Sequence, residues 1–266
     1  MFIDALGNSA NALFLLASVY VYVALSRQIA ARPTDEIADT ARAFGVPDSL
    51  LAGVFILLFT WLALTANADA AATMRTREMI GSVVVEIVVL GAVLFFLKLR
   101  GRDVPVLAGL NKITFTRAAV TGSILLIAAF PLIVLADVIT THWIGITPTP
   151  QGIVELFNNT NSSLQRVLII LIAVVFAPII EEFFFRFFLY GVLRRNVGKI
   201  TALVATSLLF AGVHAHIPSL APLFTLAVCF TIAYEWTGSI LVTMTMHSVF
   251  NAVQLFGLAL SNPHSQ

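Results

Sequence analysis

The sequence predicts an all-α fold, a polytopic membrane bundle of about eight transmembrane helices with a polar cavity inside the membrane. Three observations lead to this prediction. Hydrophobic residues make up 59% of the chain and charged residues only 11%, whereas about a quarter of the residues in an ordinary soluble chain are charged. Apolar runs long enough to cross a bilayer recur along the whole chain. These runs do not alternate between polar and apolar residues, so helices are expected and barrel strands are not.

The apolar runs define the expected transmembrane helices. They cover residues 10–26, 49–66, 79–97, 117–140, 164–193, 200–214, 219–236 and 239–260. Spans of roughly 20 residues with short connections account for this length, so residues 1–266 are expected to form a single transmembrane domain. The helices within 10–140 carry no sequence motif, and the motif-bearing half is about 164–260.

The connections between these runs predict an orientation and some local structure. The odd-numbered connections hold most of the Lys and Arg residues, whereas the connection 141–163 has none. By the positive-inside rule the odd-numbered connections face the cytoplasm, which leaves both termini outside. In the first connection Ile37, Ala41 and Phe44 recur at helical spacing, so a short helix on the membrane surface is expected before Gly45. Residues 141–163, rich in Pro, Asn, Thr and Ser, are expected to form an external loop.

Charge and cysteine content limit the partners. The formal net charge is +1 and no long basic run is present, which argues against a nucleic-acid partner, since such partners need a concentrated positive surface. The one cysteine, Cys229, cannot form an internal disulfide. The lipid bilayer is the expected surrounding, and for a prokaryotic chain the plasma (inner) membrane is the expected location. The oligomeric state is not predicted.

Ionisable side chains inside apolar runs are costly, by about 2.5–3.5 kcal/mol for a central Arg or Asp. Several of them have structural interpretations. Glu86 is alone in the third run, where a hydrogen bond to a neighbouring helix is favoured over a functional contact. Asp137 and Glu235 lie near the ends of their runs and can reach the interface, and His264 lies in the polar tail.

The fifth run holds the most informative cluster, Ala-Pro-Ile-Ile-Glu-Glu-Phe-Phe-Phe-Arg. Glu182 and Arg186 are four residues apart, so they are expected to form an ion pair on one helix face. Glu181 is rotated about 100° from its neighbour by the helical period, so it faces another part of the bundle without that partner. Pro178 lacks an amide hydrogen and is expected to kink the helix one turn before Glu181 and to free the carbonyl of Val174.

Three more polar residues lie in later runs. His214 ends the sixth run, and His247 and Asn251 share one helix face in the eighth. A rise of 1.5 Å per residue places Glu181 at roughly 16–18 Å, His247 at roughly 14 Å, Asn251 at roughly 20 Å and His214 at about 21–24 Å from the same side of the membrane. A single membrane histidine is more often a structural contact, but four polar groups at similar depth indicate one site.

These residues resemble, in order, the three motifs of the CAAX protease and bacteriocin-processing family, also called the Abi or type II CAAX endopeptidase family. The motifs are a paired glutamate with arginine (Glu181, Glu182 and Arg186), phenylalanine to histidine (210–214) and histidine to asparagine (247–251). The resemblance covers roughly 164–260, with no departure at these positions. It implies a helical membrane fold with a polar cavity and a glutamate-dependent endopeptidase of membrane-associated peptides or proteins. For eukaryotic members the implied substrates are the prenylated C-terminal tails of proteins. The roles of prokaryotic members include bacteriocin maturation, peptide signalling and self-immunity.

Hydrolysis of a peptide bond needs a base for water, donors for the developing oxyanion and an acid for the departing amine. We expect Glu181 to be the general base, with His214 sharing the water, and His247 and Asn251 to donate to the oxyanion. The family resemblance implies the same roles. Glu182 and Arg186 are then supporting residues, because they fix the helix turn that aims the base.

Other hypotheses use the same side chains. Glu181 could attack the carbonyl directly to form an anhydride, or glutamate and histidines could hold a zinc ion. No cofactor is expected, because the chain has no His-Glu-x-x-His pair. Outside catalysis, the polar site would suit an inactive scaffold or self-immunity protein that binds a peptide, or a proton-coupled transporter.

Overall fold

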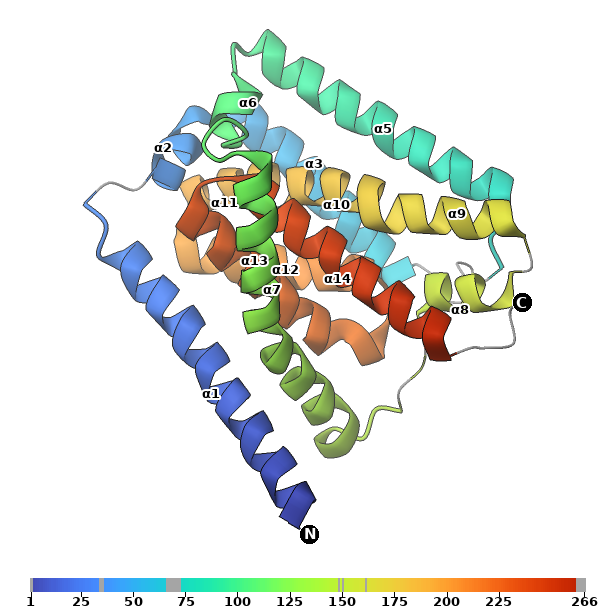
Figure 1. Ribbon diagram of the computed structural model, residues 1–266. Coiled ribbons are helices and arrows are strands. Elements are labelled where there is room, and N and C mark those ends of the chain that lie inside the picture. Colours follow the sequence, from blue (N-terminus) through green and yellow to red (C-terminus); the bar gives the residue numbers. More distant parts are fainter. Residues whose placement is uncertain are drawn as a thin grey trace.

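The computed structural model describes residues 2–33, 36–65, 73–147, 149, 151–160 and 162–261. The predicted all-helical fold is confirmed, and no strand occurs within these ranges (Figure 1). Seven helices in them are long and apolar enough to cross a membrane, so the chain fits an integral multi-pass membrane protein. These spans are Ser9–Ala30, Val46–Thr65, Thr76–Leu99, Phe115–Trp143, Ser163–Val197, Ile217–Thr237 and Ile240–Gly257. His264, expected in a polar tail, lies outside the described residues.

The sixth expected span is the short one. Helix α12 (Lys199–Val213) has 15 residues, a length of about 22 Å at 1.5 Å per residue, against a hydrocarbon core of about 30 Å. Two residues with positive φ bound it, Gly198 at 82° and Ala215 at 48°. The eight expected spans therefore become seven long helices and one short helix.

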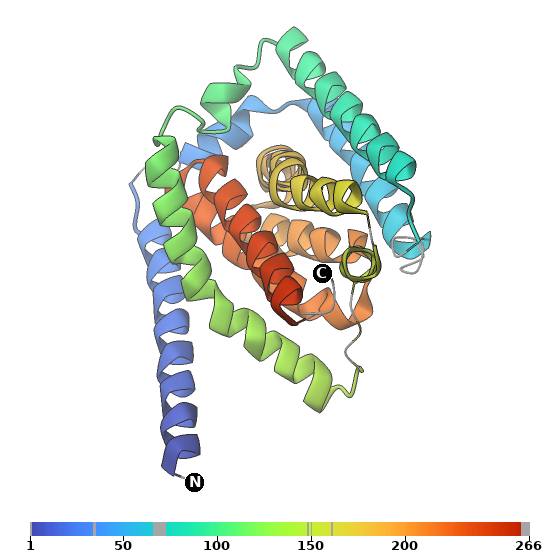
Figure 2. The same cartoon turned by 45° about the vertical axis from the view of Figure 1, so that its right-hand side comes forward.

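The bundle has an inner group of helices and an outer group (Figures 1 and 2). Helix α13 (Leu220–Thr237) packs against α7 (Phe115–Val138), α12 and α14 (Ile240–Ser261), and α7 also packs against α14. Helix α1 (Phe2–Ala30) lies along α7 on one side, while α3 (Val46–Thr65) and α5 (Thr76–Leu99) lie on the other. Large apolar side chains cover the outer helices, such as Leu64 at 81% and Val88 at 64% exposure. Such a surface is typical of contact with lipid.

The starts of α7 and α14 are held together by glycines. An added Cβ at Gly122 of α7 would lie 2.7 Å from the carbonyl oxygen of Val242 in α14. Gly109, with a φ of 70°, approaches Gly238 even more closely, and the amide of Ile240 donates to the carbonyl of Ala108 at 3.1 Å. The two helices thus begin at the same end of the bundle, and their later turns are free to frame a cavity.

The fifth span is one continuous helix with two changes of hydrogen-bond register. It consists of α9 (Ser163–Leu171), the π-helix η2 (Ile172–Phe176), α10 (Ala177–Glu182), the π-helix η3 (Phe183–Leu189) and α11 (Tyr190–Val197). The first π-helical turn lies directly before Pro178, where the sequence predicts a distortion. Such turns are rare and occur frequently at functional sites.

The connections contain the short helices α2 (Glu36–Ala43), α6 (Val104–Leu107) and α8 (Gly152–Asn159). The π-helix η1 (Ile139–Trp143) continues α7, and the 3₁₀-helix η4 (Ile217–Ser219) precedes α13. The helix expected before Gly45 is present as α2. Its apolar side packs on the bundle, where Phe44 contacts the rings of Phe187 and Phe188. The prediction that residues 141–163 form an external loop is wrong for residues 152–159. These residues form helix α8, and its Leu156 and Phe157 side chains are buried in the bundle. Tertiary packing stabilises a helix this short, and local propensity does not reveal it.

Glu235 also differs from its predicted setting. The sequence places it near a span end, within reach of the interface, but in the structure it is only 4% exposed. Its Oε1 lies 2.6 Å from Nη1 of Arg194, and its Oε2 lies 3.5 Å from Nζ of Lys199. These two cations come from α11 and α12, far from Glu235 in sequence. They offset the free-energy cost of burying its carboxylate, because a buried charge needs a partner.

Candidate functional site

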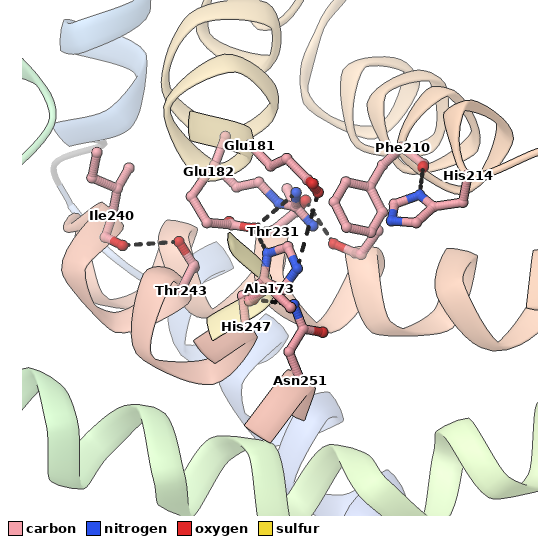
Figure 3. Close-up of polar contacts among 12 residues, drawn as sticks. Ala173, Glu181, Glu182, Phe210, His214, Thr231, Ile240, Thr243, His247 and Asn251 are labelled. Carbon is pink, nitrogen blue, oxygen red and sulfur yellow. Dashed lines mark hydrogen bonds and ion pairs between the residues drawn. The ribbon is translucent and has the colours of Figure 1, made fainter. Parts of the chain in front are cut away.

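A cavity of about 640 Å³ opens among the later turns of α7 and α14, the short helix α8, the η2–α10 segment and the turn between α12 and α13. All four polar residues that the sequence singles out line it: Glu181, His214, His247 and Asn251. Figure 3 shows them approaching one another from three helices, α10, the end of α12 and α14. Helices separated by up to 70 positions in the chain therefore build one polar site, as the depth estimate predicts.

The two adjacent glutamates have different environments. Glu182 is fully buried, and its Oε1 lies 3.1 Å from Nη1 of Arg186, so the ion pair predicted from their spacing is present. The guanidinium of Arg186 also lies over the rings of Phe210 and Phe230, at 4.3 and 5.0 Å. The side chain of Glu181 is 28% exposed and faces the cavity, and its Oε2 is buried without a hydrogen bond. Glu181 is thus the available carboxylate.

His247 connects the two glutamates. Its Nδ1 donates to Oε1 of Glu182 at 3.0 Å, and its Nε2 lies 4.0 Å from Oε2 of Glu181. Since a carboxylate accepts hydrogen bonds, the Nδ1 atom carries a proton and Nε2 is the atom presented to the cavity. The contact between Glu182 and His247 joins residues 65 positions apart. It was not predicted, and it shows that Glu182 orients the imidazole directly as well as pairing with Arg186.

The distance between Oε2 of Glu181 and Nε2 of His247 is one that a single bridging oxygen atom can span. At 4.0 Å, this distance is too long for a direct hydrogen bond. An oxygen placed about 2.8 Å from both atoms would see them about 90° apart, an angle close to that of a hydrogen-bonded water. A water molecule, or one oxygen of a tetrahedral intermediate, can therefore bridge the two groups once the side chain of Glu181 rotates slightly, because its Oε2 is buried in this structure.

His214 presents its Nε2 in the same way. The residue follows the last turn of α12, and its Nδ1 lies 2.7 Å from the carbonyl oxygen of Phe210. A carbonyl only accepts, so Nδ1 is the protonated nitrogen. The last carbonyls of a helix lack amide partners, and the ring satisfies one of them.

Asn251 reaches the distorted part of the fifth span. Its Nδ2 donates to the carbonyl oxygen of Ala173 at 2.7 Å. In the π-helical register the amide of Ala177 donates to the carbonyl of Ile172, five residues earlier. In the same register the next amide, that of residue 178, would donate to the carbonyl of Ala173. Residue 178 is Pro178, which has no amide hydrogen, so this carbonyl has no backbone donor. The sequence predicted that Val174 would be freed, one residue later, because it assumed the α-helical register. One hydrogen of the Asn251 amide remains for a ligand in the cavity.

The rest of the cavity lining is mostly apolar, with one acidic and three neutral polar side chains among the described residues. Asp137 of α7 contributes a second carboxylate, and no Lys or Arg is present among the described residues that line the cavity. Neutral polar groups come from Gln151, Ser219 and Gln254. A bound ligand thus meets negative charge and hydrogen-bonding groups between apolar walls.

Two other predictions concern this region. The hydrogen bond expected for Glu86 is not present in the described part of the chain, where the residue is exposed on α5. Within the described ranges, no three His, Cys, Asp or Glu side chains converge in a metal-binding arrangement. The described side chains of this region thus offer no preformed set of three metal ligands.

Comparison with known proteins agrees with the motifs. Residues 163–253, which include all four polar residues of the cavity, match the family model described as type II CAAX prenyl endopeptidase Rce1-like. The uncharacterized protein YpbD of Bacillus subtilis (strain 168) is 31% identical over 126 residues, which are 46% of this chain and 61% of that protein. No solved structure matches. The resemblance indicated by the sequence is therefore confirmed for residues 163–253, which are similar to the Rce1-like type II CAAX prenyl endopeptidases.

Proposed function

We propose that this protein is an intramembrane endopeptidase that hydrolyses peptide bonds of membrane-associated proteins or peptides. The observation that carries the proposal is the separation of two neighbouring carboxylates. Glu182 is buried, paired with Arg186 and hydrogen-bonded to His247, whereas Glu181 is 28% exposed and faces a cavity with His214, His247 and Asn251. A carboxylate held beside imidazoles, without a neutralising cation of its own, is suited to accept a proton from water.

The first step is the attack of water on the scissile carbonyl. Glu181 takes one proton from the water while the water oxygen forms a bond to the carbonyl carbon, and His214 holds the same water from the other side of the cavity. The unoccupied Oε2 of Glu181 supplies the acceptor for this proton. General-base assistance of this kind contributes about 10²–10⁴-fold to a rate.

The second requirement is a set of donors for the oxyanion. Asn251 offers the hydrogen of its amide that Ala173 does not use. His247, held by the carboxylate of Glu182 on Nδ1, presents Nε2 to the cavity and donates from that atom when it carries a proton. Donors fixed in a water-poor cavity stabilise developing charge far better than water does. The proton on Glu181 then passes to the departing amine nitrogen as the C–N bond breaks.

The substrate is proposed at the level of a class. The matched family is described by its action on CAAX prenyl proteins, and a cavity inside a membrane bundle with apolar walls suits peptides that reach it from the bilayer. We therefore propose membrane-anchored peptides as substrates, with prenylated tails as one member of the class. The mechanism uses side chains of this chain alone and needs no metal.

The proposal is tested with purified protein in detergent and a library of membrane-anchored peptides. Wild type is expected to cleave a subset of peptides, and Glu181→Gln to lose about 10²–10⁴-fold in rate. Glu155→Gln, an exposed carboxylate of α8, is the matched control and should keep full activity. Equal cleavage, or equal inertness, of wild type and Glu181→Gln would contradict the proposal. Peptide binding without turnover in both proteins would favour a scaffold or immunity role, and solute flux in proteoliposomes would favour a transporter.

Zinc is tested separately. The wild-type enzyme is expected to keep its activity after exhaustive treatment with a chelator. Loss of activity that returns only when zinc is added would replace water activation by Glu181 with metal-assisted hydrolysis.

A further inference from the structure

A second recess lies outside the cavity, at the surface between α2, α11 and α12. Its volume is about 310 Å³. Ala38 and Ala41 form its apolar part, and the rest consists of four cationic side chains from three different helices: Arg42, Arg194, Arg195 and Lys199. We call this site the basic recess. Its composition is the opposite of that of the cavity, where carboxylates are present and cations are absent among the described lining residues.

A buried carboxylate holds part of the basic recess in place. Glu235 binds Arg194 at 2.6 Å and Lys199 at 3.5 Å, and it also accepts a hydrogen bond from the hydroxyl of Tyr190 at 2.5 Å. The side chains of Arg194 and Glu235 are only 5% and 2% exposed. Two of the four cations are therefore ordered before any ligand binds, which lowers the entropy cost of binding.

Among the described side chains, one cation of the basic recess is not offset by an acid. Glu235 pairs with Arg194 and Lys199, and Asp39, 2.6 Å from Arg42, offsets that arginine. Arg195 is exposed and makes no ion pair within the described residues. In addition, Lys199 is the first residue of α12, a helix start that no side chain caps. Helix starts carry partial positive charge and free amides, which favours an anion.

The position of the basic recess is at one end of the bundle, where connections rich in basic residues meet. Arg32 of the first connection donates to the carbonyls of Glu235 and Trp236, at 3.3 and 2.6 Å. The indole of Trp236 donates to Gln28 at 2.9 Å. Tryptophan and clustered Arg are typical of the membrane–water interface. These features are the ones expected of a recess at the level of lipid headgroups.

We propose that the basic recess binds the phosphate group of an anionic phospholipid headgroup. Phosphate matches both the excess charge and the planar donors of arginine, which bind phosphate oxygens in pairs. Basic pockets between membrane helices on the cytoplasmic side are known to hold such headgroups. A lipid supplies the phosphate at the depth of the recess, whereas a free phosphate ion would have to come from the aqueous phase.

The test measures lipid binding by the full chain in a neutral detergent, by native mass spectrometry and by titration. The probes are short-chain phosphatidylglycerol, short-chain phosphatidylcholine and inorganic phosphate. Arg42→Gln together with Arg195→Gln removes two exposed cations while Arg194 and Lys199 keep Glu235 neutralised, so the fold should persist. Arg117→Gln, an exposed arginine at the start of α7 outside the recess, is the matched control.

Phosphatidylglycerol is expected to bind wild type and Arg117→Gln equally and the double variant roughly 25-fold more weakly, or about five-fold for each charge removed. Inorganic phosphate should compete with the lipid but bind less tightly by itself. Three results would overturn the proposal: equal binding by the double variant, equal binding of phosphatidylcholine, or inorganic phosphate binding as tightly as the lipid. The last result would make free phosphate the ligand.

Discussion

Replacing Glu182 by glutamine preserves the shape of the side chain and an oxygen that can accept from Nδ1 of His247, but it removes a negative charge from the interior. Arg186, whose side chain is 2% exposed, then stays buried without a counter-charge. Removing one partner of a buried ion pair costs about 3–5 kcal/mol. Glu182→Gln is therefore expected to destabilise the protein by this amount, which is a large part of the stability of a typical domain.

The companion substitution separates charge from packing. Arg186→Met alone should also be costly, because it leaves the buried carboxylate of Glu182 without its cation and with only the hydrogen bond from His247. The double variant has no buried charge to compensate and loses chiefly the contacts of the guanidinium with Phe210 and Phe230, worth about 1–3 kcal/mol together. The double variant should therefore be more stable than either single variant. Its turnover should nevertheless remain below that of wild type, since His247 lacks an anionic partner.

Unfolding of the four proteins in mixed micelles, followed by titration with a denaturing detergent, measures these differences as a double-mutant cycle. The sign of the coupling free energy tests whether Glu182 and Arg186 depend on each other: the double variant is expected to be more stable than either single variant. A double variant less stable than both single variants would refute the reasoning, because the two side chains would then contribute independently.

Three further predictions concern packing and specificity. Gly122→Ala should destabilise the protein by about 1–3 kcal/mol by pressing a methyl group on the α14 backbone, while Gly91→Ala, which meets nothing within 4 Å, should be neutral or slightly stabilising; thermal unfolding distinguishes them. Asn251→Asp should cost about 1–3 kcal/mol, because the Ala173 carbonyl loses its donor and faces an oxygen; unchanged stability in the same unfolding assay would contradict that contact. Peptides with Lys beside the cleaved bond should be preferred over those with Glu, and Asp137→Asn should reduce this preference in competition assays; an unaltered ratio would remove Asp137 from substrate selection.

Features that depend on local spacing or on bilayer thickness could be predicted from the sequence. The apolar runs correspond to the observed spans because lipid demands a fixed length of apolar helix. The ion pair of Glu182 and Arg186 follows from the helical period, which also turns Glu181 away from them. The common depth of the four polar residues could be predicted, since helices that cross the same membrane share a common scale, but depth alone does not make these helices neighbours.

Features that depend on helix packing could not be predicted. The hydrogen bond of Glu182 with His247 requires α10 and α14 to be neighbours, which no spacing within either helix reveals. The carbonyl without a backbone donor is that of Ala173, because the π-helical register pairs it with Pro178, which has no amide hydrogen. Asn251, from another helix, donates to this carbonyl instead. The burial of Glu235 likewise depends on cations that two other helices supply.

The central claim is that Glu181 activates a water molecule that attacks the peptide bond within the cavity. A single turnover of the best-cleaved peptide in oxygen-18 labelled water, followed by mass spectrometry of product and enzyme, tests it most directly. We predict the label in the new carboxyl terminus of the product and none in the side chain of Glu181. Label in Glu181 after that first turnover would contradict the claim, because it would mean that the carboxylate itself attacks the carbonyl.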